Sequence, residues 1–377
     1  MQSIFRVRLL SVLVSCAISL EAIAQQLPSS PTNAQPNKSR IAASAKSWES
    51  PTLRISLPTT ATKFKFSQDG EMLLTNGSNE QSAELWNLTT GKQISALKAK
   101  SGFALCDVAL SPNGQFAAAL TYSLAAPMPT KRQVEVNVWN LKTKRSQWTI
   151  SIQSHAIQTT ETPVCNVEFS PNNRVLATSI SSRSNKSQIG VRIWDVGRGR
   201  LQQVTRSAVT YIERIAFSPD SSTLGFITQV NGKSQLHLWN LNNRKLQAKL
   251  QAVDGKNLMS IVDIVFSPNR PEAIAFTYDG GISSYIYRWQ IKTGKLQGSS
   301  ELPIDRTDSL LALSPDGQTY VYGGDVTGYH IGNFQTRNSW GFPQGLSPTS
   351  MQDRVVFSPD GQQMAIARAN KSIDIIH

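Results

Sequence analysis

The chain has 377 residues, of which 40% are hydrophobic and 17% are charged. This apolar content supports a large buried core, either as two ordinary domains or as one large all-β unit. The formal charge of +13 would suggest a nucleic-acid partner in the cytoplasm, but the N-terminus argues against that compartment and so against that partner.

Residues 1–24 have the features of a secretory signal peptide. Arg6 and Arg8 form a short basic start, and an apolar run follows from Leu9 to Leu20. Ala22-Ile23-Ala24 then gives the small-x-small pattern of a cleavage site. The run is short for a transmembrane span, which needs about 20 residues. We therefore expect an exported protein, periplasmic or extracellular, that is cut after Ala24.

A second processing route is present in the same stretch. Leu13-Val14-Ser15-Cys16 resembles a lipobox, in which the Cys is lipidated and becomes the mature N-terminus. Apolar residues continue beyond Cys16, however, whereas lipoproteins usually turn polar there. Membrane attachment is therefore expected only if Cys16 is lipidated.

Residues 25–50 are rich in Pro, Ser, Asn, Gln and Ala and are predicted to form a flexible linker. Cleavage after Ala24 removes two arginines and one glutamate and leaves a net charge of +12. A basic exported protein would meet acidic envelope polymers, anionic lipid headgroups or acidic proteins. The alternative is that Lys and Arg simply keep the surface soluble.

From residue 51 onward, one turn occurs seven times. The copies are Phe66-Ser-Gln-Asp-Gly70, Leu110-Ser-Pro-Asn-Gly114, Phe169-Ser-Pro-Asn-Asn173, Phe217-Ser-Pro-Asp-Ser221, Phe266-Ser-Pro-Asn-Arg270, Leu313-Ser-Pro-Asp-Gly317 and Phe357-Ser-Pro-Asp-Gly361. Their leading residues are 44, 59, 48, 49, 47 and 44 positions apart, which is the period of a repeat architecture. In the turn, Pro presets the first corner, Asp or Asn bonds its own backbone, and Gly takes the left-handed position.

Each turn is flanked by strand patterns. Apolar residues alternate before it, as Val108 and Leu110 do before Ser111, and a second apolar run follows it, as at 364–367. A third alternating segment ends in Trp in five copies, and a turn and a fourth segment come after it. The five tryptophans are Trp86, Trp139, Trp194, Trp239 and Trp289.

The turn, followed about two dozen residues later by Trp-Asp or Trp-Asn, resembles the WD40-repeat β-propeller family over residues 51–377. The resemblance implies an all-β, seven-bladed propeller of four-stranded antiparallel blades, here a divergent, exported member of bacterial type. The family's Gly-His pair and the usual Asp between the second and third strands are absent, so we expect the blades to rely more on packing. Gly332 and Ile376 replace the Trp in copies six and seven.

The seventh copy has three strands and ends one residue after Ile376. A three-stranded blade would leave an open edge in the ring. Upstream of the first turn, Leu53, Ile55 and Leu57 alternate within residues 52–59. As in the WD40 family, we expect a strand at about 52–59 to pair beside residues 373–376 and close the ring.

The sequence shows no catalytic constellation, so we expect no enzyme activity, no cofactor and no metal. It has no Gly-rich phosphate loop and no paired pattern of carboxylates. Its histidines lack the spacing of a zinc or nucleophile motif. These histidines are His155, His237, His330 and His377.

Two cysteines remain after processing. Cys106 and Cys165 each precede the Ser of their turn by five residues, which gives them equivalent positions on the innermost strands of blades two and three. Export favours a disulfide between them. Adjacent inner strands could, however, leave the Cα atoms beyond the limit of about 7 Å, and the alternative is two separate core thiols.

Connections at about 121–133, 151–162 and 181–188 are longer than their counterparts, and in a WD40-type ring all three would emerge on one face. Loops that depart from a repeat often carry function, although long surface loops also drift freely because they cost little. The candidate partner-binding residues in these loops are Lys131, Arg132, His155, Arg183 and Lys186.

We therefore expect a non-enzymatic, monomeric scaffold that binds a protein or an acidic envelope component through this face. The alternative is a small-ligand-binding or hydrolytic propeller that uses its central channel, or envelope association through charge alone, which would weaken with salt. The position four residues before each turn Ser is mixed in charge and matches no cofactor site. Its residues are Lys63, Asp107, Asn166, Arg214, Asp263, Leu310 and Arg354.

Overall fold

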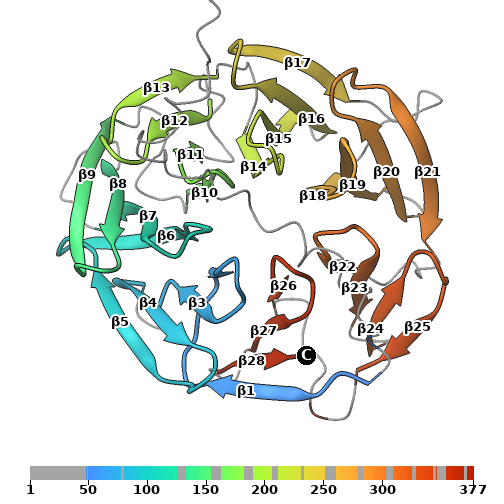
Figure 1. The fold of residues 1–377 in the computed structure, drawn as a ribbon, viewed down its shortest axis with the longest axis horizontal. Helices are drawn as coiled ribbons and strands as arrows, with labels where there is room; N and C mark the ends of the chain where they lie inside the picture. The colour runs from blue at the N-terminus through green and yellow to red at the C-terminus, as the bar shows by residue number, and fades with distance from the viewer. Residues whose placement is uncertain are drawn as a thin grey trace, which may run out of the picture. The chain divides into compact units, whose positions relative to one another are not determined.

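The computed structural model describes residues 48, 50–77, 80–124, 133–153, 163–181, 190–205, 211–230, 233–250, 260–278, 284–302, 309–324, 328–342, 345, 354–368 and 372–377. In these residues the regular elements are all β-strands. They form seven four-stranded antiparallel sheets, which stand as blades around a ring (Figure 1). The predicted all-β, seven-bladed propeller is confirmed.

Within each blade the strands follow chain order from the centre outward, except that β1 completes the last blade (Figure 1). Blades 1 and 2 are β2 (Phe64–Phe66), β3 (Met72–Thr75), β4 (Ser82–Asn87) and β5 (Gln93–Lys98), then β6 (Phe103–Leu110), β7 (Phe116–Ser123), β8 (Gln133–Asn140) and β9 (Arg145–Gln153). Blades 3 and 4 are β10 (Val164–Phe169), β11 (Val175–Ser181), β12 (Arg192–Asp195) and β13 (Leu201–Val204), then β14 (Tyr211–Phe217), β15 (Thr223–Val230), β16 (Lys233–Asn240) and β17 (Lys245–Leu250). Blades 5 and 6 are β18 (Ser260–Phe266), β19 (Glu272–Tyr278), β20 (Ser284–Gln290) and β21 (Leu296–Leu302), then β22 (Ser309–Leu313), β23 (Thr319–Gly324), β24 (Gly328–Asn333) and β25 (Ser339–Gly341). Blade 7 is β26 (Arg354–Phe357), β27 (Met364–Arg368), β28 (Ser372–Ile376) and β1 (Leu53–Leu57).

The ring closes through β1, which pairs antiparallel with β28 and so supplies the outer strand of blade 7 (Figure 1). Ile55 lies opposite Ile375, and the backbones of Thr52 and His377 exchange hydrogen bonds of 2.9 and 3.0 Å. Leu57 is fully buried in the core that blade 7 shares with blade 1. The predicted closing strand is confirmed, and its buried leucine makes the seam an apolar contact as well as a hydrogen-bonded one.

Trp48 extends the packed unit beyond the predicted start of the propeller. Its ring is 2% exposed and meets the edge of Phe357 at a centroid distance of 5.9 Å. It belongs to the apolar core between blades 6 and 7. The sequence interpretation had assigned this residue to the linker, because one Trp in a polar stretch gives no strand pattern.

The repeated turns share one set of hydrogen bonds. In the first turn, the Ser67 hydroxyl donates to Asp69 Oδ1 at 2.5 Å and accepts from the Met72 N–H at 2.9 Å, while Asp69 Oδ1 accepts from the Glu71 N–H at 3.0 Å. The same bonds recur at Ser111, Ser170, Ser218, Ser314 and Ser358. The Ser is therefore as necessary as the Asp or Asn, because it is buried and links both strands of the hairpin.

The hydrophobic core consists of seven clusters, each between two neighbouring blades. The Trp that ends the third strand packs against the preceding blade, so that Trp86 belongs to the cluster of blades 7 and 1, and Trp194 to that of blades 2 and 3. Each fully buried large apolar side chain contributes roughly 1.5–3 kcal/mol. Two of these tryptophans also donate an indole N–H to a Thr on the second strand, Trp86 to Thr75 and Trp194 to Thr178.

In blade 6, Tyr320 fills the place of the Trp that ends the third strand in five other blades. Tyr320 on β23 lies directly opposite Gly332 on β24. A Cβ atom on Gly332 would lie 2.3 Å from Tyr320 Cζ, so the phenol ring occupies the space above the glycine. Burial raises the pKa of Tyr320 to about 12. The aromatic group is thus supplied by the second strand instead of the third.

Candidate functional site

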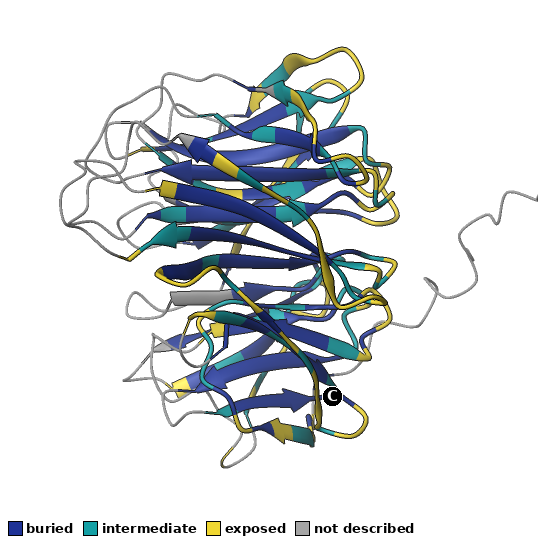
Figure 2. Cartoon of the chain, turned by 90° about the vertical axis from the view of Figure 1, so that its left-hand side faces the viewer, coloured by how far each residue is buried: buried dark blue, intermediate teal, exposed yellow. Residues whose placement is uncertain are grey.

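The ring has two faces, which differ in their connections. The turns between first and second strands and between third and fourth strands lie on one side, where many of their residues are exposed (Figure 2). We call this the turn face. The antiparallel order of each blade places the opposite strand ends on the other side, which we call the loop face.

The strand ends that flank the predicted loop cluster lie on the loop face. These ends are described, with β7 ending at Ser123, β9 ending at Gln153 and β11 ending at Ser181. The candidate residues Lys131, Arg132, His155, Arg183 and Lys186 themselves lie outside the described residues.

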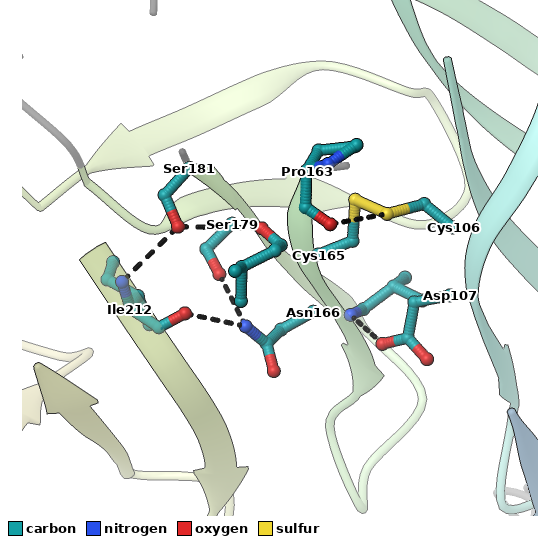
Figure 3. Close-up of a disulfide and its surroundings, with 10 residues drawn as sticks. Cys106, Asp107, Pro163, Cys165, Asn166, Ser179, Ser181 and Ile212 are labelled. Atoms are coloured by element: carbon teal, nitrogen blue, oxygen red, sulfur yellow. Dashed lines mark hydrogen bonds between the residues drawn. A yellow bond between two sulfur atoms is a disulfide. The ribbon is translucent and has the colours of Figure 1, made fainter. Parts of the chain in front are cut away.

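A disulfide joins the inner strands of blades 2 and 3 below these strand ends (Figure 3). Cys106 on β6 and Cys165 on β10 have Cα atoms 5.8 Å apart, inside the usual range for a bridge. Cys106 lies where the pairing of β6 with β7 shifts register between Leu105 and Asp107. Such a bulge re-aims a side chain. The expected geometric obstacle is therefore absent in this pair.

Side-chain hydrogen bonds continue this link into blade 4 (Figure 3). Asp107 Oδ2 accepts from the Val167 N–H at 2.9 Å, which ties β6 to β10. Asn166 donates to the Ile212 carbonyl at 3.2 Å, and Ser181 accepts from the Ile212 N–H at 3.3 Å, which ties blade 3 to β14. The inner strands of blades 2, 3 and 4 are thus fastened to one another below the loop face.

A second set of links occurs on the turn face of the same blades. The Asn113 N–H of blade 2 donates to Asn173 Oδ1 of blade 3 at 3.0 Å, and the Asn172 N–H donates to Ser221 Oγ of blade 4 at 3.0 Å. Asn173 and Ser221 have φ values of 62° and 59°, where four other turns have Gly. A side chain there costs strain of roughly 1–2 kcal/mol, which the bond between blades offsets. These turns line a polar groove of about 550 Å³ that also includes Arg244.

The side chains around the ring centre are charged and partly exposed. Lys65 of blade 1 makes an ion pair of 2.7 Å with Glu168 of blade 3, although β6 of blade 2 lies between their strands. Ala109 is the equivalent residue on β6, and its small side chain leaves room for the pair. Burial would lower the pKa of Lys65, but the charges of Glu168 and Asp107 and the hydrogen bond to Glu168 outweigh it, so this pKa is raised.

The described histidines His237, His330 and His377 belong to three different blades. His237 is 2% exposed, stacks on Phe226 at 4.9 Å and lies 2.9 Å from Thr228 Oγ1. Burial, with a smaller contribution from the charge of Lys249, lowers its pKa to about 4. His330 stacks on Tyr322 in blade 6. Both are ordinary members of third strands.

In the described part of the chain, no group of three or more His, Cys, Asp or Glu side chains could hold a metal ion. Within the same ranges, no helix is long and apolar enough to cross a bilayer.

Sequence reasoning found the two cysteines and the strand ends of the loop face. It missed the pair between Lys65 and Glu168 and the bonds from Asn173 and Ser221 to neighbouring turns. The one available signal was the replacement of Gly by Asn or Ser at the fifth turn position, which the turn chemistry alone does not favour.

Comparisons with known proteins give one informative similarity. No family model matches the chain. Over 175 residues it is 30% identical to the small ribosomal subunit protein RACK1 of Caenorhabditis elegans, a WD40 protein, and this stretch covers 42% of the chain and 47% of that protein. The chain thus spans about half the length of this curated relative. The seven four-stranded blades and their repeated turn show a β-propeller, and the similarity to RACK1 supports a propeller of WD40 type.

Proposed function

We propose that this propeller is an exported, non-catalytic scaffold that binds a protein or an acidic envelope component through the loop face of blades 2 and 3. The relative RACK1 is named as a protein of the small ribosomal subunit, and so works within an assembly. By analogy, the ring of this chain supplies a rigid frame, and the long connections at 121–133, 151–162 and 181–188 supply specificity.

The observation that carries this proposal is the fastening of blades 2 and 3 at their inner strands. The Cys106–Cys165 disulfide and the bond from Val167 N–H to Asp107 lie next to the strand ends from which the long connections start. A frame that does not deform reduces the entropy lost when a partner binds. The basic residues of the connections then favour a partner with an acidic surface.

The disulfide also supports export, because such bonds persist in oxidising compartments and are rare in the cytosol. We infer that residues 1–24 are a signal peptide, that residues 25–50 contain a linker, and that the mature protein is periplasmic or extracellular. Mass spectrometry of the mature N-terminus tests this. A first residue of Gln25 supports secretion after cleavage at Ala24, a lipidated Cys16 supports a membrane anchor, and an intact Met1 contradicts export.

The binding proposal is tested by a cross-linked pull-down of the mature protein from the cell envelope. One variant changes the four basic loop residues to Ser: Lys131, Arg132, Arg183 and Lys186. A matched control changes four exposed basic residues of the turn face to Ser: Lys142, Arg145, Arg198 and Lys245. Both variants lose the same charge.

We expect a protein or polymer that the wild type and the turn-face control recover and that the loop variant loses. Equal recovery by all three would contradict binding through the loop face. Loss of the captured partner from both variants would indicate attraction by net charge alone. In that case the wild type should also lose the partner when the capture is repeated at higher salt.

A further inference from the structure

Around the ring centre, the positions two and four residues before each turn Ser carry four cations and three carboxylates. These charged residues are Lys63, Lys65, Arg214 and Arg354, with Asp107, Glu168 and Asp263. Two of the three carboxylates form ion pairs, Glu168 with Lys65 at 2.7 Å and Asp263 with Arg214 at 3.9 Å. The side chains of Lys65 and Arg214 are 39% and 45% exposed, so solvent reaches this layer.

The third carboxylate points to the neighbouring blade and not to a cation. Asp107 is 8% exposed, and its Oδ2 accepts from the Val167 N–H (Figure 3). Lys63 and Arg354 therefore have no ion pair within the described residues. Both stand four residues before the Ser of their turn, Lys63 just before β2 and Arg354 at the start of β26, and so lie at the same level of adjacent blades.

Burial and neighbouring cations lower the pKa of both Lys63 and Arg354. Burial lowers the pKa of Lys63 to about 8; the charge of Asp107 opposes this shift, and those of Arg354 and Arg214 add to it. Burial and the charge of Arg214 likewise lower the pKa of Arg354, and the charge of Asp107 opposes this shift as well. At the level of Lys63, Arg214 and Arg354 these three cations face only two carboxylates, Asp107 and Asp263, so repulsion between the cations is partly uncompensated and destabilises the ring. An anion bound between them removes both the repulsion and the cost of desolvation.

We propose that the ring centre, between Lys63, Arg214 and Arg354, binds a phosphate group, either as the free ion or at the end of a larger molecule. Two guanidinium groups and one ammonium match the several oxygens of a phosphate better than they match one carboxylate. This site is separate from the partner surface of the loop face, so either proposal can fail without the other.

The test uses the purified mature protein and isothermal titration with inorganic phosphate at pH 7 and constant ionic strength. We expect saturable binding that weakens at least tenfold in the Lys63→Met and Arg354→Gln variants. Arg174→Gln is the matched control, because Arg174 is exposed on the turn face. The proposal of a site for free phosphate at the centre is overturned if the wild type shows no heat of binding. It is also overturned if the wild type, the two site variants and the control all bind phosphate with the same affinity.

The dependence on pH gives a second readout, with sulfate as the probe because its charge stays constant between pH 7 and 9. Lys63 loses its proton near pH 8, so sulfate binding to the wild type should weaken as the pH rises from 7 to 9. Lys63→Arg keeps its charge and should bind equally at both values. It also serves as the folded variant if Lys63→Met does not fold. A wild-type affinity that does not change with pH would contradict the role of Lys63.

Vesicles of phosphatidylglycerol distinguish the source of the phosphate. Binding of free phosphate without vesicles assigns the site to a soluble anion. Vesicle binding that requires Lys63 and Arg354, in the absence of binding to free phosphate, assigns it to a phosphate carried on a larger molecule. Failure of both probes refutes the proposal.

Discussion

Removal of the disulfide between blades 2 and 3 should destabilise the ring by a predictable amount. The perturbation is the double variant Cys106→Ser and Cys165→Ser, which leaves two small side chains in place. The bridge closes a loop with a sequence separation of 59 residues. In the chain-entropy treatment, such a loop lowers the entropy of the unfolded state by about 14 cal/mol/K, which corresponds to about 4 kcal/mol at 25 °C.

This free energy translates into a modest change in melting temperature. A propeller of roughly 330 residues has an unfolding entropy of about 0.7 kcal/mol/K, so a loss of 4 kcal/mol lowers Tm by about 6 °C. Calorimetry of the mature protein measures it in three samples: the oxidised wild type, the wild type with a reductant, and the double variant.

The reduced wild type and the double variant should melt together, and the oxidised wild type about 6 °C higher. The reductant should not change the Tm of the double variant, which controls for effects on other groups. An oxidised wild type that melts with the double variant would refute the reasoning, because the bridge would then restrict neither the unfolded chain nor the ring.

Three further predictions concern single side chains. Leu57→Ala, at the fully buried seam, should lower the free energy of unfolding in denaturant by about 2–5 kcal/mol. The same change at Leu53, which is 48% exposed, should lower it by less than about 0.5 kcal/mol. Equal losses would contradict closure by this strand. His237 binds a proton near pH 6.5 in the unfolded chain but only near pH 4 in the folded protein, so the unfolded state takes up more protons and stability falls as the pH decreases through 6.5. Between pH 7.5 and 5, the free energy of unfolding of the wild type should fall by about 2 kcal/mol more than that of His237→Gln. Parallel pH profiles of the two proteins would contradict this. Ser221→Ala keeps the positive φ and loses the hydrogen bond from the Asn172 N–H, so urea unfolding should show it about 1–2 kcal/mol less stable than the wild type. Ser221→Gly loses the same bond but relieves the strain of the positive φ, so its stability should lie closer to that of the wild type. The opposite order of the two variants would rule out strain at this turn.

The sequence predicted the features that depend on local chemistry. The turn, the apolar alternation before it and the Trp after it each depend on only a few neighbouring residues. The number of blades could therefore be predicted from the sequence before their arrangement was known. Closure by β1 was also predictable, because the alternation of Leu53, Ile55 and Leu57 matched a strand that the last blade lacked. In each case a short pattern had one structural interpretation.

The replacement for the third-strand Trp of blade 6 was harder to predict. Tyr320 and Gly332 are partners across two strands, and an aromatic ring placed over a glycine shows only once the register is known. The ion pair between Lys65 and Glu168 joins residues 103 positions apart on blades that are not neighbours. No spacing rule within one repeat reports a contact that crosses the ring.

Stability and binding should be separable in this propeller, because they depend on different parts of the ring. The seam at Leu57 holds blade 7 to blade 1, whereas the disulfide and its accompanying hydrogen bonds hold blades 2, 3 and 4. In a repeat structure each unit contacts mainly its neighbours, so weakening the seam need not deform blades on the far side. Leu57→Ala should therefore lower stability and leave partner capture by the folded protein unchanged. The double cysteine variant should reduce both, because the same bridge stabilises the ring and fixes the strand ends of the loop face. If the seam variant lost capture while still folded, the loop face would depend on the whole ring, and the local frame proposed for blades 2 and 3 would be wrong.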